Sequence, residues 1–281
     1  MEKKMSSIYI IAEIGINHNG DLGLAKKLIE QSKHSGADAV KFQKRTIDLV
    51  YTPEELDKYR ESPWGTTNRQ QKEGLEFSME QYKALEKYTK DLGMDFIVSC
   101  WDTNSVDVVE QHLDIKYHKV ASALATDKAF LKKLNDTGRP VILSTGMCTT
   151  EEINAAIQTL NNVEIVLACT STYPTKPEEV NLRHIDTLRK EYPDLKIGFS
   201  NHYNGLDACV GSVAVGAECV EFHITNDRAS YGSDQAASIE DSHSLIQAIR
   251  NMELMLGDGQ KMVYDSEVPI INKLRKVNDI V

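Results

Sequence analysis

The chain has 281 residues, long enough for one large α/β domain with a substantial core. Hydrophobic residues make up 41% and charged residues 26%, the composition of an ordinary globular protein, which excludes a disordered or fibrous chain. The net charge of −10 disfavours nucleic-acid binding. A small anion can still bind where a few lysines converge, because distant charges are screened beyond about 10 Å.

Targeting and redox signals are weak in this sequence. The first residues lead into a short apolar run that soon reaches Glu13, so no secretory signal is expected. No apolar run approaches the roughly 18 residues of a membrane span. The five cysteines lack CxxC spacing, which argues against a disulfide framework or a thiolate zinc site. We therefore expect a cytoplasmic protein with no nucleic-acid or membrane partner.

Short β-branched apolar runs alternate with longer amphipathic stretches along the chain. The first run precedes a helix predicted over residues 22–34, and a second helix is predicted over 79–92. Thr149-Thr150-Glu151-Glu152 has the pattern of another helix start. The eight expected strands cover residues 8–14, 39–42, 96–99, 116–120, 141–144, 164–168, 197–200 and 219–222.

Most of these runs show little polar alternation, which is typical of parallel strands buried on both faces. Eight strand–helix units predict a single-domain α/β fold, a (β/α)8 TIM barrel over residues 1–260, for which about 250 residues is the usual length. A doubly wound open sheet is the alternative, but no GxGxxG follows the first run. Residues 261–281 are interpreted as a closing segment or short helix.

The longest interruption, residues 46–77, follows the second strand. It contains the motif Glu61-Ser62-Pro63-Trp64-Gly65 among many polar residues. One interpretation is an elaborated loop over a catalytic mouth, because long loops are often functional. The other is a solvated insertion with no role, and the sequence leaves both open.

Polar residues follow or end every expected strand, where a barrel of this type carries its active site. Two strand-end lysines, together with hydroxyl and backbone donors, are typical of a cradle for a phosphate or carboxylate. Taken singly, each residue also has a structural interpretation, since a strand-end serine often caps the following helix. The candidates are Glu13, Lys41, Gln43, Ser99, Lys119, Ser122, Ser144, Ser171, Tyr173, Ser200, His202 and His223.

Two histidines end adjacent strands of the predicted barrel. His202 and His223 are candidates to share one divalent metal, completed by water, substrate oxygens or Glu13. Without a tight spacing motif they are equally well explained as hydrogen-bonded structural residues. No role is predicted for the surface histidines His34, His112, His184 and His243.

Seven segments run in order over nearly the whole chain: IAEIGINHNG (11–20), VKFQ (40–43), KVAS (119–122), LSTGM (143–147), CTSTYP (169–174), GFSNH (198–202) and EFHIT (221–225). In these segments the chain resembles the sialic acid synthase family, (β/α)8 enzymes that condense phosphoenolpyruvate with an N-acylated aldose. The Arg60–Gly65 and Asp227–Gln235 segments are similar to those of short, single-domain members that lack a C-terminal antifreeze-like domain.

The resemblance implies a role for each candidate. His202 and His223 would bind a divalent ion, most often manganese in the family. Glu13 would lie near the reacting aldehyde of the sugar. The other sugar contacts would be Gln43, Tyr173 and Asp234. The residues that would bind phosphoenolpyruvate are Lys41, Ser99, Lys119, Ser122, Ser144, Ser171 and Ser200.

The sugar half of the site departs from the family pattern. Better-known members bring an arginine to the sugar from the appended domain of a neighbour in a swapped dimer, and we expect this chain to lack it. Leu124 stands where the family often has an acidic sugar contact. Our hypothesis is that Arg228, or else Arg69 or Trp64, replaces the missing arginine. For Arg228 the alternative is a surface salt bridge.

The leading hypothesis is an N-acetylneuraminate synthase-like transferase that joins phosphoenolpyruvate to N-acetylmannosamine or a related N-acylated aldose, giving a nonulosonic acid and phosphate. A second hypothesis keeps phosphoenolpyruvate but takes another or a phosphorylated aldose. A third, from a different class, is a non-catalytic sugar-phosphate binding protein. The presence of Glu13, both lysines and both histidines argues against the third. A homodimer is the family's habit, but the sequence leaves the oligomeric state open.

Overall fold

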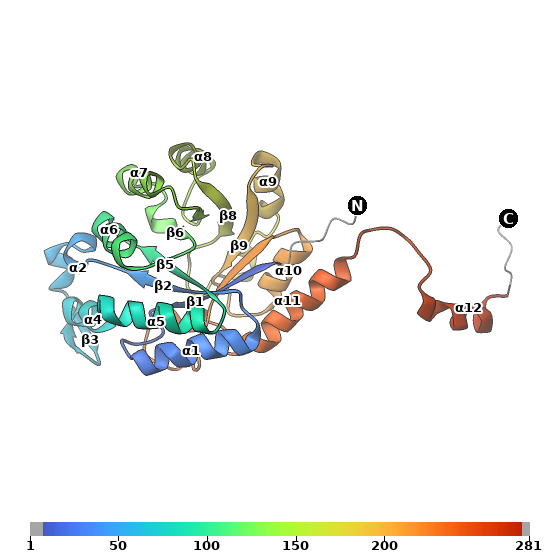
Figure 1. Cartoon of the computed structure of the whole chain (residues 1–281), viewed down its shortest axis with the longest axis horizontal. Helices are drawn as coiled ribbons and strands as arrows, with labels where there is room; N and C mark the ends of the chain where they lie inside the picture. Colours follow the sequence, from blue (N-terminus) through green and yellow to red (C-terminus); the bar gives the residue numbers. More distant parts are fainter. Residues whose placement is uncertain (1–7, 277–281) are drawn as a thin grey trace.

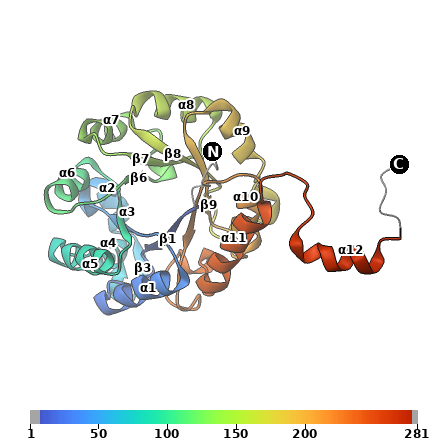
Figure 2. The same cartoon turned by 45° about the vertical axis from the view of Figure 1, so that its right-hand side comes forward.

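The computed structural model describes residues 8–276, which contain a closed barrel of eight parallel strands surrounded by helices (Figures 1 and 2). Pairing of β1 with β10, in the register Tyr9 to Cys219, closes the ring. The TIM-barrel prediction is confirmed, and the open sheet is excluded. The barrel strands are β1 (Tyr9–Gly15), β2 (Ala39–Lys44), β5 (Asp95–Cys100), β6 (His118–Val120), β7 (Val141–Ser144), β8 (Val163–Cys169), β9 (Lys196–Asn201) and β10 (Cys219–His223).

Helices form the outer ring that Figure 2 shows around the strands. The Asp21 side chain caps the first of them, and Gly36 ends it in the left-handed conformation at φ 96° that glycine adopts without strain. The predicted helix start at Thr149 is confirmed as a capping box with Glu152. The outer helices are α1 (Leu22–Ser35), α5 (Met79–Asp91), α6 (Thr103–His112), α7 (Lys128–Thr137), α8 (Thr150–Thr159), α9 (His184–Glu191), α10 (Asp207–Ala214) and α11 (Ser242–Leu256).

The interior of the barrel changes from apolar to polar along the strands. Because side chains two residues apart share a face of a strand, the residues that follow an inward apolar residue by two also point inward. Ile97 is therefore followed by Ser99, and Cys219 by Glu221 and then His223. The apolar layer consists of Ile11, Ala39, Ile97, Tyr117, Ile142, Ile165, Leu167 and Cys219. This alternation gathers the polar side chains at the C-terminal end of the barrel.

The segment 46–77 is folded rather than an open loop. Contacts join its last helix to its hairpin and to its two short helices, and Figure 1 shows these elements together at one edge of the barrel. One hydrogen bond attaches the start of the segment to the residues that follow β5: the backbone N–H of Thr46 donates to Asp102 Oδ2 at 2.7 Å. The elements are α2 (Ile47–Val50), α3 (Pro53–Leu56), β3 (Tyr59–Ser62), β4 (Gly65–Thr67) and α4 (Asn68–Leu75).

The C-terminal segment does not close the barrel. After α11 the chain extends outward to η4 (Asp265–Glu267) and α12 (Val268–Leu274), which Figures 1 and 2 show away from the barrel. Most side chains from 258 to 276 are exposed, Ile270 and Leu274 among them. The expected short helix is present, but the closing role is wrong for the described part, because its apolar residues do not pack on the barrel. Residues 277–281 lie outside the described residues.

The remaining short elements are the 3₁₀ turns η1 (Ser122–Leu124), η2 (Pro177–Glu179) and η3 (Gln235–Ala237). Each of the five cysteines is a free thiol. Within residues 8–276 no helix combines the length and the apolar character needed to traverse a bilayer.

Candidate active site

Two adjoining cavities open at the C-terminal end of the barrel. The inner cavity has a volume of about 230 Å³ and is lined by strand-end residues from around the barrel. The outer cavity has a volume of about 380 Å³ and lies toward the 46–77 segment. Gln43, Trp101 and Tyr173 line both, so they form the junction between the cavities. The predicted residues that line the inner cavity are Glu13, Lys41, Gln43, Ser99, Lys119, Ser122, Ser144, Ser171, Tyr173, Ser200, His202 and His223.

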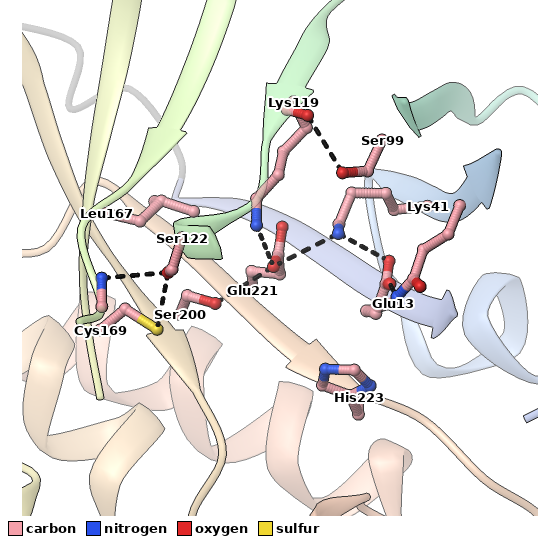
Figure 3. A network of polar contacts seen from close by, with 12 residues as sticks. Glu13, Lys41, Ser99, Lys119, Ser122, Leu167, Cys169, Ser200, Glu221 and His223 are labelled. Atoms are coloured by element: carbon pink, nitrogen blue, oxygen red, sulfur yellow. Dashed lines mark hydrogen bonds and ion pairs between the residues drawn. The ribbon is translucent and has the colours of Figure 1, made fainter. Parts of the chain in front are cut away.

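A buried chain of ion pairs crosses the inner cavity (Figure 3). Lys41 Nζ lies 2.9 Å from Glu13 Oε2 and 3.6 Å from Glu221 Oε1. Lys119 Nζ lies 3.2 Å from the same Glu221 oxygen. All four side chains are at most 6% exposed. Two ammonium groups and two carboxylates therefore balance one another, which a buried cluster of charges requires.

Burial and pairing oppose each other in the pKa values of these groups. Burial alone would raise the pKa of Glu221, but the ammonium groups of Lys119 and Lys41 hold it below the usual range. Burial alone would lower the pKa of Lys41, but the nearby Glu13 and Glu221 raise it. For Lys119 burial prevails and its pKa is lowered, despite the attraction of Glu221. At neutral pH Lys41 and Glu221 are thus held as ions.

Hydroxyl groups complete the polar wall of the inner cavity. Ser99 donates to the Lys119 carbonyl at 3.0 Å, and Ser200 donates to Glu221 Oε1 at 3.1 Å. The Gly146 N–H donates to Ser122 Oγ at 3.0 Å. The buried Ser144 hydroxyl has no hydrogen-bond partner among the described residues. Such an unsatisfied donor, in a cavity also lined by two lysines, is suited to an anionic ligand.

The two predicted metal ligands lie side by side, with ring centroids 5.3 Å apart. His202 Nδ1 lies 2.7 Å from the Thr170 carbonyl, to which it can only donate, so its Nε2 is left to bind a ligand. His223 Nδ1 is buried without a hydrogen-bond partner among residues 8–276 and faces Asp234 Oδ2 at 3.6 Å. Within the described residues no cluster of three or more His, Cys, Asp and Glu residues converges on one point. The pair fits a divalent ion that takes its other ligands from substrate or water.

The two histidines of the pair lie in different environments. Burial lowers the pKa of His223 despite the nearby Asp234. The lowered pKa keeps the imidazole neutral, as a metal ligand must be. Burial would also lower the pKa of His202, but Cys169 and the Thr170 carbonyl raise it. The Tyr173 ring lies 4.0 Å from the His202 ring and shields one side of the pair from solvent.

The residues expected to face the sugar divide into two groups. Gln43 Nε2 donates to Glu13 Oε1 at 2.7 Å, and Tyr173 and Asp234 line the outer cavity. Arg228 does not reach either cavity, because Glu240 accepts from its backbone N–H at 2.7 Å and pairs with its side chain at 3.9 Å. The sugar-binding expectation for Arg228 is therefore not supported, and its salt-bridge alternative is what the structure contains.

The two other candidates for the missing arginine also lie elsewhere. Arg69 pairs with Asp48 at 2.7 Å and Glu73 at 3.3 Å on the surface. The Trp64 ring packs against Gly74, where an added Cβ would lie 2.2 Å from it. Neither residue lines the inner or the outer cavity.

The comparisons with known proteins agree on one family. A family model described as the NeuB family matches residues 28–261. The chain belongs to the NeuB family. It is 38% identical to human N-acetylneuraminate-9-phosphate synthase over 275 residues, covering 95% of this chain and 76% of the human protein. It is 37% identical to N,N'-diacetyllegionaminic acid synthase of Legionella pneumophila, covering 95% of this chain and 78% of that protein.

A solved structure supports the same assignment. The N-acetylneuraminic acid synthetase of Leptospira borgpetersenii, crystallised with citrate, superposes with a TM-score of 0.82 at 27% identity, covering 97% of this chain and 94% of that chain. As a NeuB-family protein, the chain is a phosphoenolpyruvate-dependent nonulosonic acid synthase. This excludes the hypothesis of a non-catalytic binding protein. The family uses a divalent metal, in agreement with the fit of the histidine pair.

Glu221, Arg45 and Lys72 line the two cavities but were not predicted from the sequence. Glu221 joins the two lysines, and its signal was its place two residues before His223 on one inward face. Arg45 and Lys72 line the outer cavity. Arg45 follows directly after β2, so its position at a strand end was visible. Lys72 lies on α4 within the 46–77 segment, where the barrel pattern predicts no side-chain positions.

Proposed function

We propose that this synthase condenses phosphoenolpyruvate with N-acetylmannosamine or a related N-acylated aldose, giving N-acetylneuraminate or a related nonulosonic acid and inorganic phosphate. The observation that supports this most is the meeting of two buried lysines and a histidine pair in one cavity of about 230 Å³. The lysines suit a phosphate and a carboxylate, and the histidine pair suits a metal beside an aldehyde.

The inner cavity binds phosphoenolpyruvate in this proposal. Lys41 and Lys119 hold its anionic groups through charge-assisted hydrogen bonds. Ser144 supplies the donor that has no partner within residues 8–276, and other hydroxyls complete the cradle. Glu221 keeps both ammonium groups aimed into the cavity before the substrate arrives. Such preorganised charge stabilises the developing phosphate without rearrangement. The hydroxyl ligands are Ser99, Ser122, Ser144, Ser171 and Ser200.

His202 and His223 hold a divalent ion, for which we propose Mn²⁺. When bound, this ion supplies a Lewis acid for the aldehyde of the sugar. Glu13 contacts the aldose at its reacting end, and Gln43 orients Glu13 through the 2.7 Å hydrogen bond. Tyr173 covers the histidines and limits access of water.

The reaction forms one carbon–carbon bond and releases phosphate. C3 of phosphoenolpyruvate attacks the aldehyde carbon, water adds at C2, and the phosphate leaves with cleavage of its C–O bond to C2. The chain's main contribution is to hold the two reactants in attack geometry, which can lower a barrier by about 7–11 kcal/mol. The acyl groups on the aldose are selected at the junction of the two cavities and beyond it, toward Gln43, Tyr173 and Asp234.

The test is release of inorganic phosphate from phosphoenolpyruvate with Mn²⁺, with and without N-acetylmannosamine and then with a panel of other aldoses. We expect release that requires both metal and an N-acylated aldose, with the mass of a nonulosonic acid in the product. The His202→Ala variant serves as the blank. Binding of phosphoenolpyruvate without release on any aldose would contradict the proposal.

A further inference from the structure

Trp64 lies at the tip of the hairpin of β3 and β4, which Figure 1 shows beside α4. The two strands pair Ser62 with Gly65, so Pro63 and Trp64 occupy the central positions of the turn. The Ser62 hydroxyl donates to the Gly65 carbonyl at 2.9 Å and closes the turn. Proline fixes its own φ, and Gly65 adopts a φ of 144° that favours glycine, so this sequence suits the tight turn.

The backbone of two neighbouring segments supports the Trp64 ring. A Cβ added to Gly74 of α4 would lie 2.2 Å from Trp64 Cγ, so the ring can lie this close only to a glycine. A Cβ added to Gly20 would lie 2.1 Å from the Gly74 carbonyl oxygen, so α4 lies equally close to the turn that follows β1. Because β1 also carries Glu13, the indole ring is fixed relative to the active site.

Tyr231, from the loop that follows β10, packs on the Trp64 ring. The two rings meet edge to face, with centroids 5.7 Å apart and ring planes at 75° to each other. Aromatic pairs favour this arrangement. The Tyr231 hydroxyl is buried and has no hydrogen-bond partner among the described residues. The ring of Tyr231, rather than its hydroxyl, therefore makes the contact.

The loop of residues 225–238, which carries Tyr231, has few other attachments at its tip. A bridge between its two flanking residues closes its base. Within the described part of the chain, the hydrogen bonds of residues 226–235 run inside the loop or to Glu240 just beyond it. The packing of Tyr231 on Trp64 thus attaches the tip of the loop to the inserted hairpin.

The same loop brings Asp234 to the sugar side of the site. Asp234 follows Tyr231 by three residues and lines the outer cavity, and its Oδ2 lies 3.6 Å from His223 Nδ1. A Cβ added to Gly15 would lie 3.1 Å from Glu13 Oε1 and 3.5 Å from Asp234 Oδ2, so the two carboxylates approach the same point of β1. A displacement of Tyr231 over so short a link moves Asp234 as well, and a misplacement of about 1 Å is costly in an active site.

We propose that Trp64 and Tyr231 are positioning residues for the aldose, because their contact holds the 225–238 loop with Asp234 beside the histidine pair. This inference rests on the proposed function, in which Asp234 contacts the aldose. Neither aromatic residue lines the inner or the outer cavity, so both act through Asp234. The phosphoenolpyruvate cradle belongs to the barrel strands and the turns that follow them, so it does not depend on this contact.

The first test is steady-state kinetics of Tyr231→Leu with N-acetylmannosamine, phosphoenolpyruvate and Mn²⁺. We expect the KM for the aldose to rise about 3- to 10-fold, the value of one aromatic pair, and the KM for phosphoenolpyruvate to stay within about twofold. Tyr231→Phe keeps the ring and loses only the unpartnered hydroxyl, so it retains both wild-type values. Tyr59→Leu, at an exposed aromatic position of the same hairpin, is the matched control and changes neither KM.

A double-mutant cycle tests whether Tyr231 acts through Asp234. Asp234→Ala removes the carboxylate that the contact positions. Adding Tyr231→Leu to Asp234→Ala should therefore raise the KM for the aldose by less than about twofold further. A general loss of structure would instead multiply the two effects.

Amide hydrogen exchange measures the attachment of the loop without any substrate. We expect residues 226–235 to exchange faster in Trp64→Leu and in Tyr231→Leu than in the wild type, because the tip of the loop is released. Exchange in the barrel strands stays as in the wild type, which shows that both variants are folded. Unchanged exchange of the loop in both variants would overturn the inference.

The kinetic outcomes separate this inference from the proposed function. Phosphate release with a wild-type KM for the aldose in Tyr231→Leu would overturn the inference and leave the proposed function intact. An equal rise in KM for both substrates, or full multiplication of the effects of Tyr231→Leu and Asp234→Ala, would also overturn it. Absence of phosphate release by the wild type with every aldose would overturn the proposed function, and this inference with it.

Discussion

The inner and outer cavities differ in how their charges are balanced. In the inner cavity each buried ammonium lies within 3.6 Å of a carboxylate, and the strands of the barrel supply every member of the cluster. In the outer cavity Lys72, on an inserted helix, has no such partner among the described residues. A balanced site is ready before its ligand binds, whereas an unbalanced one gains most from a ligand of opposite charge. A balanced site suits a reaction step that a whole family shares, and an unbalanced site suits selection among substrates.

The largest expected effect breaks the inner cavity at its histidine pair. His202→Ala removes one of only two imidazoles that fit the metal, so we expect phosphate release to fall to the background rate. The measurement is phosphate release at saturating Mn²⁺ and phosphoenolpyruvate. His184→Ala, at the start of α9, is the control and retains wild-type rates. Activity within about 10-fold of wild type in His202→Ala would remove this histidine from the site.

The next largest effect concerns the carboxylate that balances the charges of the inner cavity. Glu221→Gln takes the shared carboxylate from Lys41 and Lys119, and breaking a buried pair in this way lowers the free energy of unfolding by about 3–5 kcal/mol. Because Lys119 then lacks a counter-ion and Lys41 keeps only Glu13, phosphoenolpyruvate should raise Tm more in the variant than in the wild type. Thermal unfolding with and without phosphoenolpyruvate measures both changes. An equal or smaller Tm shift in the variant would contradict the claim that Glu221 balances the charges of the two lysines.

The ion pairs of Glu221 with Lys41 and Lys119 make the stability of the protein depend on pH in a defined direction. The pKa of Glu221 is held below its unfolded value, so its stabilising contribution is complete at neutral pH and is lost as the pH falls through the lowered pKa. We therefore expect the stability difference between wild type and Glu221→Gln to persist at pH 6 to 8 and to shrink only in strong acid. Denaturant unfolding from pH 8 down into strong acid checks the sign. A difference that grows on acidification would contradict it.

A smaller effect is expected where the inner cavity is tightly packed. In Gly146→Ala the added Cβ would lie 2.2 Å from Ser171 Oγ and 2.9 Å from Ser122 Oγ, so both hydroxyls must turn away. We expect the KM for phosphoenolpyruvate to rise about 10-fold, the value of one lost hydrogen bond to a charged group. The KM for the aldose is the internal control and stays within about twofold. An unchanged KM for phosphoenolpyruvate would exclude these hydroxyls from its binding.

The smallest effect concerns the residue that the sequence favoured for the sugar. Arg228→Ala removes a surface ion pair with Glu240 at 3.9 Å. Such pairs contribute at most about 1 kcal/mol, so the free energy of unfolding and the KM for the aldose should both stay near wild type. Steady-state kinetics over a range of aldose concentrations test this. If the KM for the aldose instead rose by about an order of magnitude, Arg228 would be restored as a sugar ligand.

The barrel and the inner cavity were largely predictable from the sequence. Parallel strands of a barrel end at one rim, so Lys41 and Lys119 could be placed together without a structure. Glu221 was missed because an acidic residue is unexpected in an anion site until its role between two lysines is seen. Lys72 was missed because the path of the 46–77 segment depends on its own packing rather than on the barrel. Arg228 was misplaced because chain order could not reveal its capture by Glu240.

The most direct test of the separation between the two cavities is calorimetric titration of phosphoenolpyruvate in the presence of Mn²⁺ and without an aldose. We predict that Lys119→Met raises the Kd of phosphoenolpyruvate by about 10- to 100-fold, because a charge-assisted contact is lost. Lys72→Met should bind phosphoenolpyruvate with the Kd of the wild type, because Lys72 lines only the outer cavity. Equal weakening in both variants would contradict a division of labour between the inner and the outer cavity.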